Sequence, residues 1–388
     1  MSAASAARSA NPARPPFRAD VVGSFLRPAR LKRARETLLG PQTSDRHLGP
    51  HDNAELRAIE DDCVHEVVMM QERAGLQSAT DGELRRRSWW LDLIMGWDGF
   101  SADRAGMSEV KWRNKQGGTM ASSRLWATGP IRWRPSATVR AFEFLKRTAN
   151  VVPKVTLPAP LILHMFGGGD RGILEGHYKD IEAFWSDVVA AYRAEVKALA
   201  AAGATYIQFD DTSIAFLCDP VYREAVQRWG NEPEALLRLY ARRMNEVLEA
   251  VPSGMTVTFH QCRGNREGHW MAEGGYDPVA DVLFNAINVH GYFLEYDSER
   301  AGGFAPLRLL PKDKTVVLGI MSSKTAELET ADALKRRIDE AAKFAPLGQL
   351  AISPQCGFSS SIGGNPLTEA DQERKLSRLV EVARGVWG

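Results

Sequence analysis

Short apolar stretches with the composition of β-strands recur along the chain, and longer stretches with helical periodicity separate them. This alternation is typical of parallel α/β proteins, in which each strand is followed by a helix that covers the sheet. The stretches lie near residues 19–23, 76–81, 151–157, 205–210, 255–261, 288–294, 315–320 and 350–354. Because eight strands close a (β/α)8 barrel, we predict an α/β fold of the TIM-barrel type.

Several of the intervening stretches have the periodicity of amphipathic helices. Residues 181–202 place apolar side chains on one helical face, and Gly203 behind them can terminate a helix. Residues 236–251 and 331–345 follow the same pattern. The helices that the barrel requires are therefore present between its predicted strands.

The stretch between the second and third predicted strands is longer than one crossover helix requires. Within it, residues 111–135 carry aromatic and β-branched side chains around Gly-rich turns, which favours a hairpin. We predict an inserted cover over the barrel at about residues 90–150. Since barrels of this type commonly exceed about 250 residues as one domain, we assign residues 17–388 to a single domain. Residues 1–16, rich in Ala, Ser, Pro and Arg, are predicted to form a flexible tail.

Charge and hydropathy exclude several classes of partner. Lysine and arginine number 49 against 48 acidic residues, so the net charge of +1 gives no field that attracts nucleic acid or anionic lipid. No apolar run approaches the roughly 18 residues that span a bilayer, and the first residues have no apolar stretch typical of a secretory signal. We expect a cytoplasmic protein with neither a nucleic-acid partner nor a membrane partner. Its 4 cysteines are too few for a disulfide scaffold and suit metal binding.

Residue types that bind metals follow three of the predicted strands. His260 and Cys262 stand two residues apart in extended chain, so their side chains face the same way. Cys356 follows the eighth strand and Glu295 follows the sixth. The carboxyl ends of all strands meet at one rim of a barrel, which would bring these residues together. One imidazole, two thiolates and a carboxylate suit Zn²⁺, and zinc can keep an incoming thiol nucleophilic as a thiolate.

Six motifs in order along the chain resemble those of the cobalamin-independent methionine synthase family, especially its short members that correspond to the catalytic barrel of the long enzyme. The motifs are VGSFLRP at 22–28, TDGE at 80–83, QFDD at 208–211, HQC at 260–262, Glu295 and QCGF at 355–358. The zinc ligands implied by the resemblance are His260, Cys262, Glu295 and Cys356. It also implies that homocysteine replaces one ligand and then takes a methyl group from a folate to give methionine.

The resemblance further implies a site for the amino-acid end of homocysteine. Glu83 and Asp210 match carboxylates that hold the ammonium group, and the backbone around Gly23 and Ser24 meets the carboxylate. From the residues alone, Glu83 could instead pair with the arginines at 85–87, and Asp210 could cap a helix. Since adjacent side chains on extended chain point to opposite faces, only one residue of the pair Asp210 and Asp211 should reach the ligand.

One expected catalytic residue is missing. Where the long members carry a histidine in an HSPR segment, this chain has Met321. A methylfolate is a poor electrophile unless its departing nitrogen is protonated, so another group has to supply the proton. Candidates at the predicted barrel mouth are Lys324, Ser322, His164 and His290.

The alkyl donor stays open at this stage. It could be methyltetrahydrofolate, another methyl donor, or an alkyl group brought by a carrier protein. Tryptophans 89 and 90, together with those of the insert, could form a wall for a flat donor, or could pack the cover on the barrel.

Three other functions compete with homocysteine methylation. An enzyme resembling epoxyalkane:coenzyme M transferase would alkylate a thiol that carries a sulfonate, and would not need both Glu83 and Asp210. A metal-free lyase resembling uroporphyrinogen decarboxylase would have no use for two thiols at the rim. A non-catalytic zinc-bearing protein would hold a closed four-ligand site that exchanges no ligand for a thiol.

Overall fold

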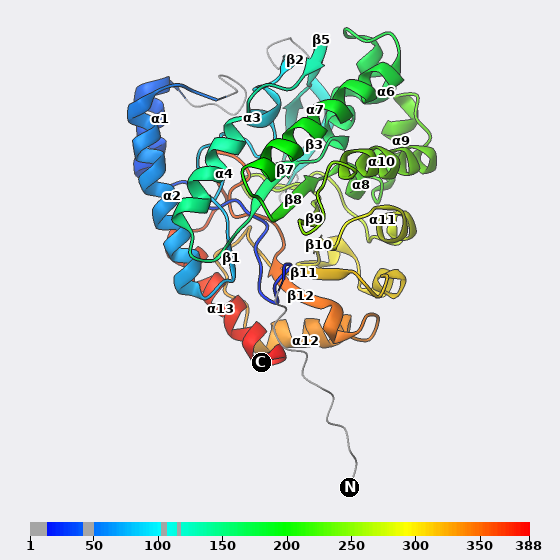
Figure 1. Ribbon diagram of the computed structural model, residues 1–388. Helices are drawn as coiled ribbons and strands as arrows, with labels where there is room; N and C mark the ends of the chain where they lie inside the picture. Colours follow the sequence, from blue (N-terminus) through cyan, green and yellow to red (C-terminus); the bar gives the residue numbers. More distant parts are fainter. Residues whose placement is uncertain (1–13, 42–49, 102–106, 115–117) are drawn as a thin grey trace.

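The structure is a computed structural model that describes residues 14–41, 50–101, 107–114 and 118–388. Most of the predicted tail, residues 1–13, lies outside the described residues. The assignment of the remaining chain to one domain stays a prediction. Figure 1 shows strands at the centre of the molecule with helices around them.

Six parallel strands form one continuous sheet in the spatial order β12-β11-β10-β9-β8-β7, which follows the order of the sequence. They are β7 (Val155–Pro158), β8 (Tyr206–Asp211), β9 (Thr256–Gln261), β10 (Gly291–Glu295), β11 (Thr315–Met321) and β12 (Leu350–Pro354). Two short strands, β1 (Ser78–Ala79) and β6 (Val152–Pro153), pair in parallel just before β7. Ala19 makes a parallel bridge to Ile352 of β12, which closes the ring. The predicted TIM barrel is therefore confirmed.

The first barrel position is less regular than predicted. Residues 19–23 form only the single bridge at Ala19, and the second strand is two residues long. Side chains, not a neighbouring strand, satisfy the carbonyl groups of this segment. The donors are Lys154 Nζ to Val21 at 2.5 Å, Gln208 Nε2 to Val22 at 2.7 Å and Thr80 Oγ1 to Gly23 at 2.6 Å. Because these side chains occupy the acceptors, no ladder of backbone hydrogen bonds forms there.

The inside of the barrel combines an apolar layer with a buried ion pair. Val317 lies beside Phe293 and Ala351 on neighbouring strands, and the three side chains form a buried cluster with Val22. Lys154 lies over the Phe293 ring, and its Nζ lies 3.2 Å from Asp20 Oδ1. This packed interior supports the side chains at the rim above it.

Helices form the outer layer because they bury apolar side chains against the barrel, and six of the eight longer ones begin at a residue whose side chain caps the helix. The longer ones are α1 (Ala29–Leu39), α2 (Ala54–Ala74), α4 (Ala137–Thr148), α7 (Ile181–Ala201), α9 (Pro220–Arg228), α10 (Pro233–Leu248), α12 (Ala331–Ala341) and α13 (Glu369–Trp387). The short ones are α3 (Leu91–Ile94), α5 (Leu161–Gly167), α6 (Gly169–Leu174), α8 (Ser213–Phe216) and α11 (Ala280–Ala286). As predicted, α7 ends just before Gly203, whose φ of 92° is left-handed. Among the described residues, no helix has the length and apolarity to cross a membrane.

The predicted cover is present as two antiparallel strand pairs. Strand β2 (Asp98–Ser101) pairs with β5 (Trp126–Arg132), and between them β3 (Met107–Arg113) pairs with β4 (Thr119–Ser123). Residues 102–106 and 115–117 of the insert lie outside the described residues. The cover lies at the top of Figure 1, at the opposite end of the molecule from α12.

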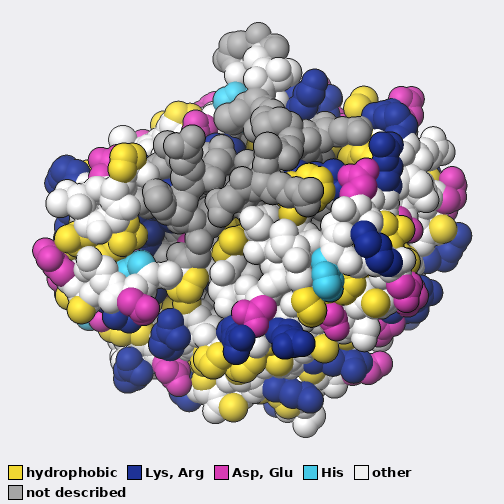
Figure 2. Space-filling view, turned by 90° about the horizontal axis from the view of Figure 1, so that it is seen from above, with side chains coloured by type: hydrophobic (Ala, Val, Ile, Leu, Met, Phe, Trp, Pro, Cys, Tyr) yellow, Lys and Arg dark blue, Asp and Glu magenta, His cyan; other side chains and the backbone are white. Residues whose placement is uncertain are grey.

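The loop that follows β9 anchors the cover. The backbone of Arg113 exchanges hydrogen bonds of 2.7 and 2.9 Å with Trp270 in that loop. Seen from this end, basic and acidic side chains are interspersed, in keeping with the net charge of +1 (Figure 2). The cover is thus attached over the rim at which the candidate metal ligands lie.

Candidate metal centre and substrate pocket

Three of the predicted metal ligands meet at the carboxyl ends of β9 and β12. His260 belongs to β9, Cys262 follows it directly, and Cys356 follows β12. One ligand atom from each residue lies within 4.8 Å of the other two, and the two sulfur atoms are 3.5 Å apart. All three side chains are buried. Residues that are 94 positions apart in the sequence are therefore close enough to share one ion.

The imidazole of His260 is oriented for a metal. Its Nδ1 donates a hydrogen bond of 3.1 Å to the carbonyl oxygen of Phe293, which lies beside it on β10. Its Nε2 is buried and has no hydrogen-bond partner among the described residues. A ring nitrogen fixed as a donor leaves the other one with a free lone pair, as metal-binding histidines require. An otherwise unsatisfied buried atom thus fits a metal ligand.

The contact between the two thiols changes the pKa of both. The hydrogen bond from the Cys356 thiol lowers the pKa of Cys262 to about 5, against the opposing effect of burial. The same contact raises the pKa of Cys356 far above its usual value. The Gly264 N–H donates to the Cys262 sulfur at 3.3 Å and supports its charge. One thiolate is therefore available at neutral pH, and a cation bound to both sulfurs would displace the second proton.

An asparagine joins the two loops that carry the cysteines. Asn265 donates from Nδ2 to the Gly357 carbonyl oxygen at 2.6 Å, and its Oδ1 accepts from Asn365 at 2.8 Å. A Cβ atom at Gly357 would lie 1.9 Å from Ser24 Oγ, so a side chain there would displace the Ser24 hydroxyl. The sulfur positions are thus fixed by contacts between loops.

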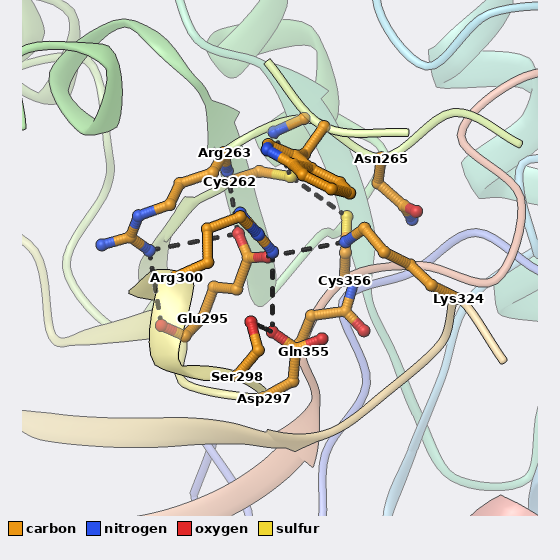
Figure 3. Close-up of polar contacts among 12 residues, drawn as sticks. Cys262, Arg263, Asn265, Glu295, Asp297, Ser298, Arg300, Lys324, Gln355 and Cys356 are labelled. Atoms are coloured by element: carbon orange, nitrogen blue, oxygen red, sulfur yellow. Dashed lines mark hydrogen bonds and ion pairs between the residues drawn. The ribbon is translucent and has the colours of Figure 1, made fainter. Parts of the chain in front are cut away.

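Glu295 lies beside this group but is bound by cations (Figure 3). Its Oε1 pairs with Arg300 and lies 3.5 Å from Lys324 Nζ, and its Oε2 accepts from the Arg263 N–H at 2.9 Å. Burial alone would raise the pKa of Glu295, but the charges of Arg300, Lys324 and Arg263 lower it overall. The carboxylate is not part of the group whose ligand atoms lie within 4.8 Å. Its role as a fourth ligand stays a prediction.

A cavity of about 960 Å³, partly open to solvent, lies over the metal ligands. Its lining includes two carboxylates that lie near each other, Glu83 and Asp210, which are called the acidic wall below. It also includes four aromatic side chains, called the aromatic wall: Trp89, Trp90, Trp112 and Phe166. The rings of Trp90 and Phe166 are stacked, with centroids 4.9 Å apart. The cavity therefore joins a metal centre, an acidic wall and an aromatic wall.

The acidic wall contains both carboxylates that the sequence assigned to the substrate. Glu83 has a left-handed backbone with φ of 56°, and its Oε2 is buried without a hydrogen-bond partner among the described residues. Burial raises the pKa of Asp210 to about 7, the nearby charge of His260 opposes that rise, and the charge of Glu83 adds to it. Both observations indicate a place for a cation, because an ammonium group would satisfy the orphan oxygen and stabilise both charges.

Asp211 has a different role from its neighbour. It also touches the cavity, but its Oδ2 accepts hydrogen bonds from the N–H of Ile214 at 2.9 Å and from Gln261 Nε2 at 3.1 Å. These contacts hold the turn that leads into α8, so Asp211 has a structural role. Asp210 is the better placed of the pair for a ligand, as the sequence indicated.

The substrate residues near the N-terminus lie where the sequence placed them. Ser24 lines the cavity, and Gly23 lies directly before it with φ of 151°. A Cβ atom at Gly23 would lie 2.5 Å from Cγ2 of Thr156, so only glycine fits. Their contact with a substrate carboxylate stays a prediction.

Two of the four proton-donor candidates lie away from the cavity. His290 is exposed before β10 and accepts from the Val257 N–H near the start of β9, at the end of the barrel opposite the metal ligands. His164 is buried in α5, with Nδ1 2.9 Å from the Tyr240 hydroxyl and Nε2 2.8 Å from Asp170. The structure therefore contradicts both assignments.

The other two candidates make local contacts. The backbone N–H of Ser322 donates to Glu329, and its hydroxyl accepts from the Lys324 N–H. The Lys324 ammonium pairs with Glu295. Neither lines the cavity, and Met321 at the end of β11 is fully buried.

Some residues of the site were not found from the sequence. Asn265, Arg266 and Met271 follow the HQC motif and line the cavity, and Phe166 belongs to α5. The position of Asn265, three residues after Cys262, was a usable signal. The others depend on the path of the loop after β9 and on the folding of the cover.

Comparison with known proteins identifies the family of the chain. A family model described as "Cobalamin-independent synthase, Catalytic domain" matches residues 151–384. The uncharacterized proteins YxjH and YxjG of Bacillus subtilis are each 39% identical to the chain, over 96% of its length and over 95% and 96% of their own. A protein of known structure from Listeria monocytogenes, assigned as a vitamin-B12-independent methionine synthase, has a TM-score of 0.72 and 34% identity over 96% of this chain and 98% of its own.

The chain therefore belongs to the cobalamin-independent methionine synthase family, whose catalytic domain is a methyltransferase barrel. Within that family it is similar to proteins of nearly its own length, such as YxjH and YxjG. A methionine synthase of Saccharolobus solfataricus is a more distant relative, with 23% identity over 87% of each chain. The predicted resemblance is confirmed.

Proposed function

We propose that the protein is a zinc-dependent methyltransferase that methylates the sulfur of homocysteine to give methionine. The observation that carries this proposal is the position of three metal-binding side chains and two carboxylates in the wall of one cavity. The family membership supports methyl transfer in general. Zinc and the amino-acid thiol follow from the chemistry of the side chains.

His260, Cys262 and Cys356 would hold the zinc ion, and Glu295 is the predicted fourth ligand at the side of the group. When bound there, zinc supplies the positive charge that keeps a substrate thiol deprotonated at neutral pH. Two protein thiolates already neutralise a divalent ion, so a further thiolate bound to it retains electron density and nucleophilicity. The set fits zinc better than hard cations, which prefer oxygen ligands.

Glu83 and Asp210 would bind the ammonium group of homocysteine, and the backbone at Gly23 and Ser24 would meet its carboxylate. The unsatisfied Glu83 Oε2 and the raised pKa of Asp210 support a cationic group at this wall. Holding the amino-acid end fixes the direction of the thiol toward the metal, which converts the attack into an intramolecular step.

The aromatic wall would take the methyl donor. Trp89, Trp90 and Phe166 offer flat apolar surfaces that suit a planar donor such as a methylfolate. Met321 cannot deliver a proton to the departing nitrogen of such a donor. The proton for that nitrogen therefore has to come from another group. The family supports a folate donor, and no comparison supports an alkyl-carrier protein.

The acidic wall also disfavours the competing functions. A sulfonate-bearing thiol would meet two carboxylates at the place where it needs cations. A lyase without a metal would leave His260 Nε2 and two buried thiols without a purpose.

Zinc-edge X-ray absorption with and without L-homocysteine tests the proposal directly. We expect the number of sulfur ligands to rise by one when homocysteine binds. The matched control is 4-mercaptobutanoate, which has the same thiol and carboxylate but no amino group, and which should give the same change only at higher concentration. Zinc that keeps its ligands at saturating homocysteine would contradict a catalytic site and favour a structural one.

A further inference from the structure

Each carboxylate of the acidic wall has one oxygen held by an uncharged hydrogen-bond donor. The Thr156 hydroxyl donates to Glu83 Oε1 at 2.7 Å, and the Gln208 side-chain amide donates to Asp210 Oδ1 at 2.7 Å. The second oxygen of Glu83 has no hydrogen-bond partner among the described residues. The two donors thus fix the rotation of each carboxylate.

The register of the sheet sets the two donors side by side. Thr156 on β7 and Gln208 on β8 are direct neighbours in the parallel pairing, and both are buried. Asp210 stands two residues after Gln208 on the same strand, so both side chains point to the same face. The donors therefore lie one level below the carboxylates, inside the barrel.

Further contacts fix the direction of the threonine hydroxyl. Arg86 Nη1 lies 3.2 Å from Thr156 Oγ1 and donates to it, so the hydroxyl proton is free to point at Glu83. The same Nη1 lies 3.3 Å from Glu83 Oε1, the oxygen that the hydroxyl already holds. Arg86 Nη2 donates to the Thr156 carbonyl at 2.7 Å and locks the guanidinium in place. Both groups therefore occupy Oε1 and leave Oε2 for a ligand.

Hydrogen bonds also hold the backbone of Glu83. Its N–H donates to Asp81 Oδ1 at 2.9 Å, and its carbonyl accepts from Arg27 at 2.8 Å. Its positive φ of 56° is uncommon for a residue with a side chain and persists only where surrounding contacts enforce it. Such enforced conformations occur preferentially at functional sites.

We propose that Thr156 and Gln208 are positioning residues that turn one oxygen of Glu83 and one of Asp210 toward the ammonium group of the substrate. The inference rests on the proposed function, in which these carboxylates bind that group. Thr156 and Gln208 orient the carboxylates without adding positive charge. Arg86 pairs with Glu83 Oε1, and Glu83 Oε2 stays available to a cation. Thr156 and Gln208 therefore set the preference for thiols that carry an α-amino group over thiols that lack it.

Thr156 allows a sharp test, because its two γ atoms have separate roles. The methyl Cγ2 packs close to Gly23, whereas only Oγ1 reaches Glu83. Thr156→Val keeps the shape and removes the hydroxyl, and Thr156→Ser keeps the hydroxyl and removes the methyl. Thr258→Val is the matched control, since Thr258 is buried on β9 beside Gln208, two strands away from Thr156.

The experiment measures the dissociation constants of L-homocysteine and of 4-mercaptobutanoate for the zinc-loaded protein by calorimetry. In Thr156→Val we expect homocysteine to bind roughly tenfold more weakly, in line with a lost hydrogen bond to a charged group. Binding of 4-mercaptobutanoate and the zinc content should not change. Thr156→Ser should restore most of the affinity, and Thr258→Val should behave as the unchanged protein.

Three results would overturn the inference. Equal weakening of both thiols in Thr156→Val would assign the hydroxyl to the general shape of the pocket. Unchanged homocysteine affinity would remove Thr156 from substrate binding. Loss of the fold in both Thr156→Val and Thr156→Ala would assign it to stability. If the unchanged protein binds both thiols equally, the failure lies instead in the ammonium role of Glu83 and Asp210, that is, in the proposed function itself.

Discussion

The two sides of the barrel are held together differently. From β7 to β12 the strands form a continuous ladder of backbone hydrogen bonds, and the metal ligands follow the ends of these strands. On the other side, residues 19–23 are held mainly by side chains such as Lys154 and Gln208. That irregular side supplies Val22, Ser24 and Glu83 to the cavity. The ladder therefore places the candidate metal ligands and Asp210, whereas side-chain contacts place the segment that carries Ser24.

The largest expected effect comes from the ladder side. Cys356→Ser should reduce bound zinc to background and abolish methyl transfer, because a hydroxyl is a far weaker zinc ligand than a thiolate. Metal content measured by atomic absorption, with circular dichroism to verify folding, tests this expectation. Cys63→Ser is the control, since Cys63 is buried in α2. A Cys356→Ser protein with full zinc and activity would refute the assigned centre.

Replacing the buried Lys154 should destabilise the irregular side of the barrel. Lys154→Met leaves Asp20 buried without its cation and removes the donor to Val21, which should cost about 3–5 kcal/mol of unfolding free energy. Urea denaturation measures the change. Lys375→Met gives the comparison, because Lys375 is equally buried but its partner Glu329 is partly exposed to solvent. Equal losses of unfolding free energy in both variants would show that the contacts of Lys154 stabilise the fold no more than those of Lys375.

The two sides of the barrel also differ in how well the sequence predicted them, because one is held by backbone pairing and the other by side chains. The strands of the ladder were predicted to within a few residues, because short apolar stretches of strand composition pair with neighbouring strands of similar composition. The segment at 19–23 was predicted as a strand, but its hydrogen-bond partners are side chains more than fifty residues away, which no local pattern reveals. The cover was predicted from its turn chemistry, which is local.

The site shows the same limit. His260, Cys262 and Cys356 were predictable because they follow strand ends, and strand ends share a rim. The pairing of Glu295 with Arg300 was not, because it depends on the turn between them. His290 was assigned to the barrel mouth, but it lies directly before Gly291, the first residue of β10, whereas the mouth is at the other end of that strand.

A smaller effect is expected from the acidic wall. Glu83→Gln keeps the shape and an acceptor for Thr156 but removes the charge, so homocysteine should bind roughly 10- to 100-fold more weakly. Calorimetry with zinc-loaded protein measures this loss, and the zinc content should stay constant. If the homocysteine affinity does not change, Glu83 has no part in ammonium binding and the irregular side serves the fold alone.

The smallest effect is a pH dependence. The pKa of Asp210 is about 7, so its charge is lost as the pH falls through that value. An ammonium group binds the ionised form, hence protonation of Asp210 should add a fall in homocysteine affinity of up to tenfold per unit below about pH 7. Asp210→Asn should flatten this profile. A profile that remains unchanged in that variant would assign the pH dependence to another group.

The bridge that Asn265 makes between the two cysteine loops bears on how the proposed zinc site would be loaded. The two sulfur atoms lie 3.5 Å apart, and a hydrogen bond within the protein joins their loops. In small zinc domains the metal is needed for folding, because nothing else orders the ligands. In this barrel, contacts between loops would order the cysteines without an ion, so removal of zinc by a chelator should leave the fold intact.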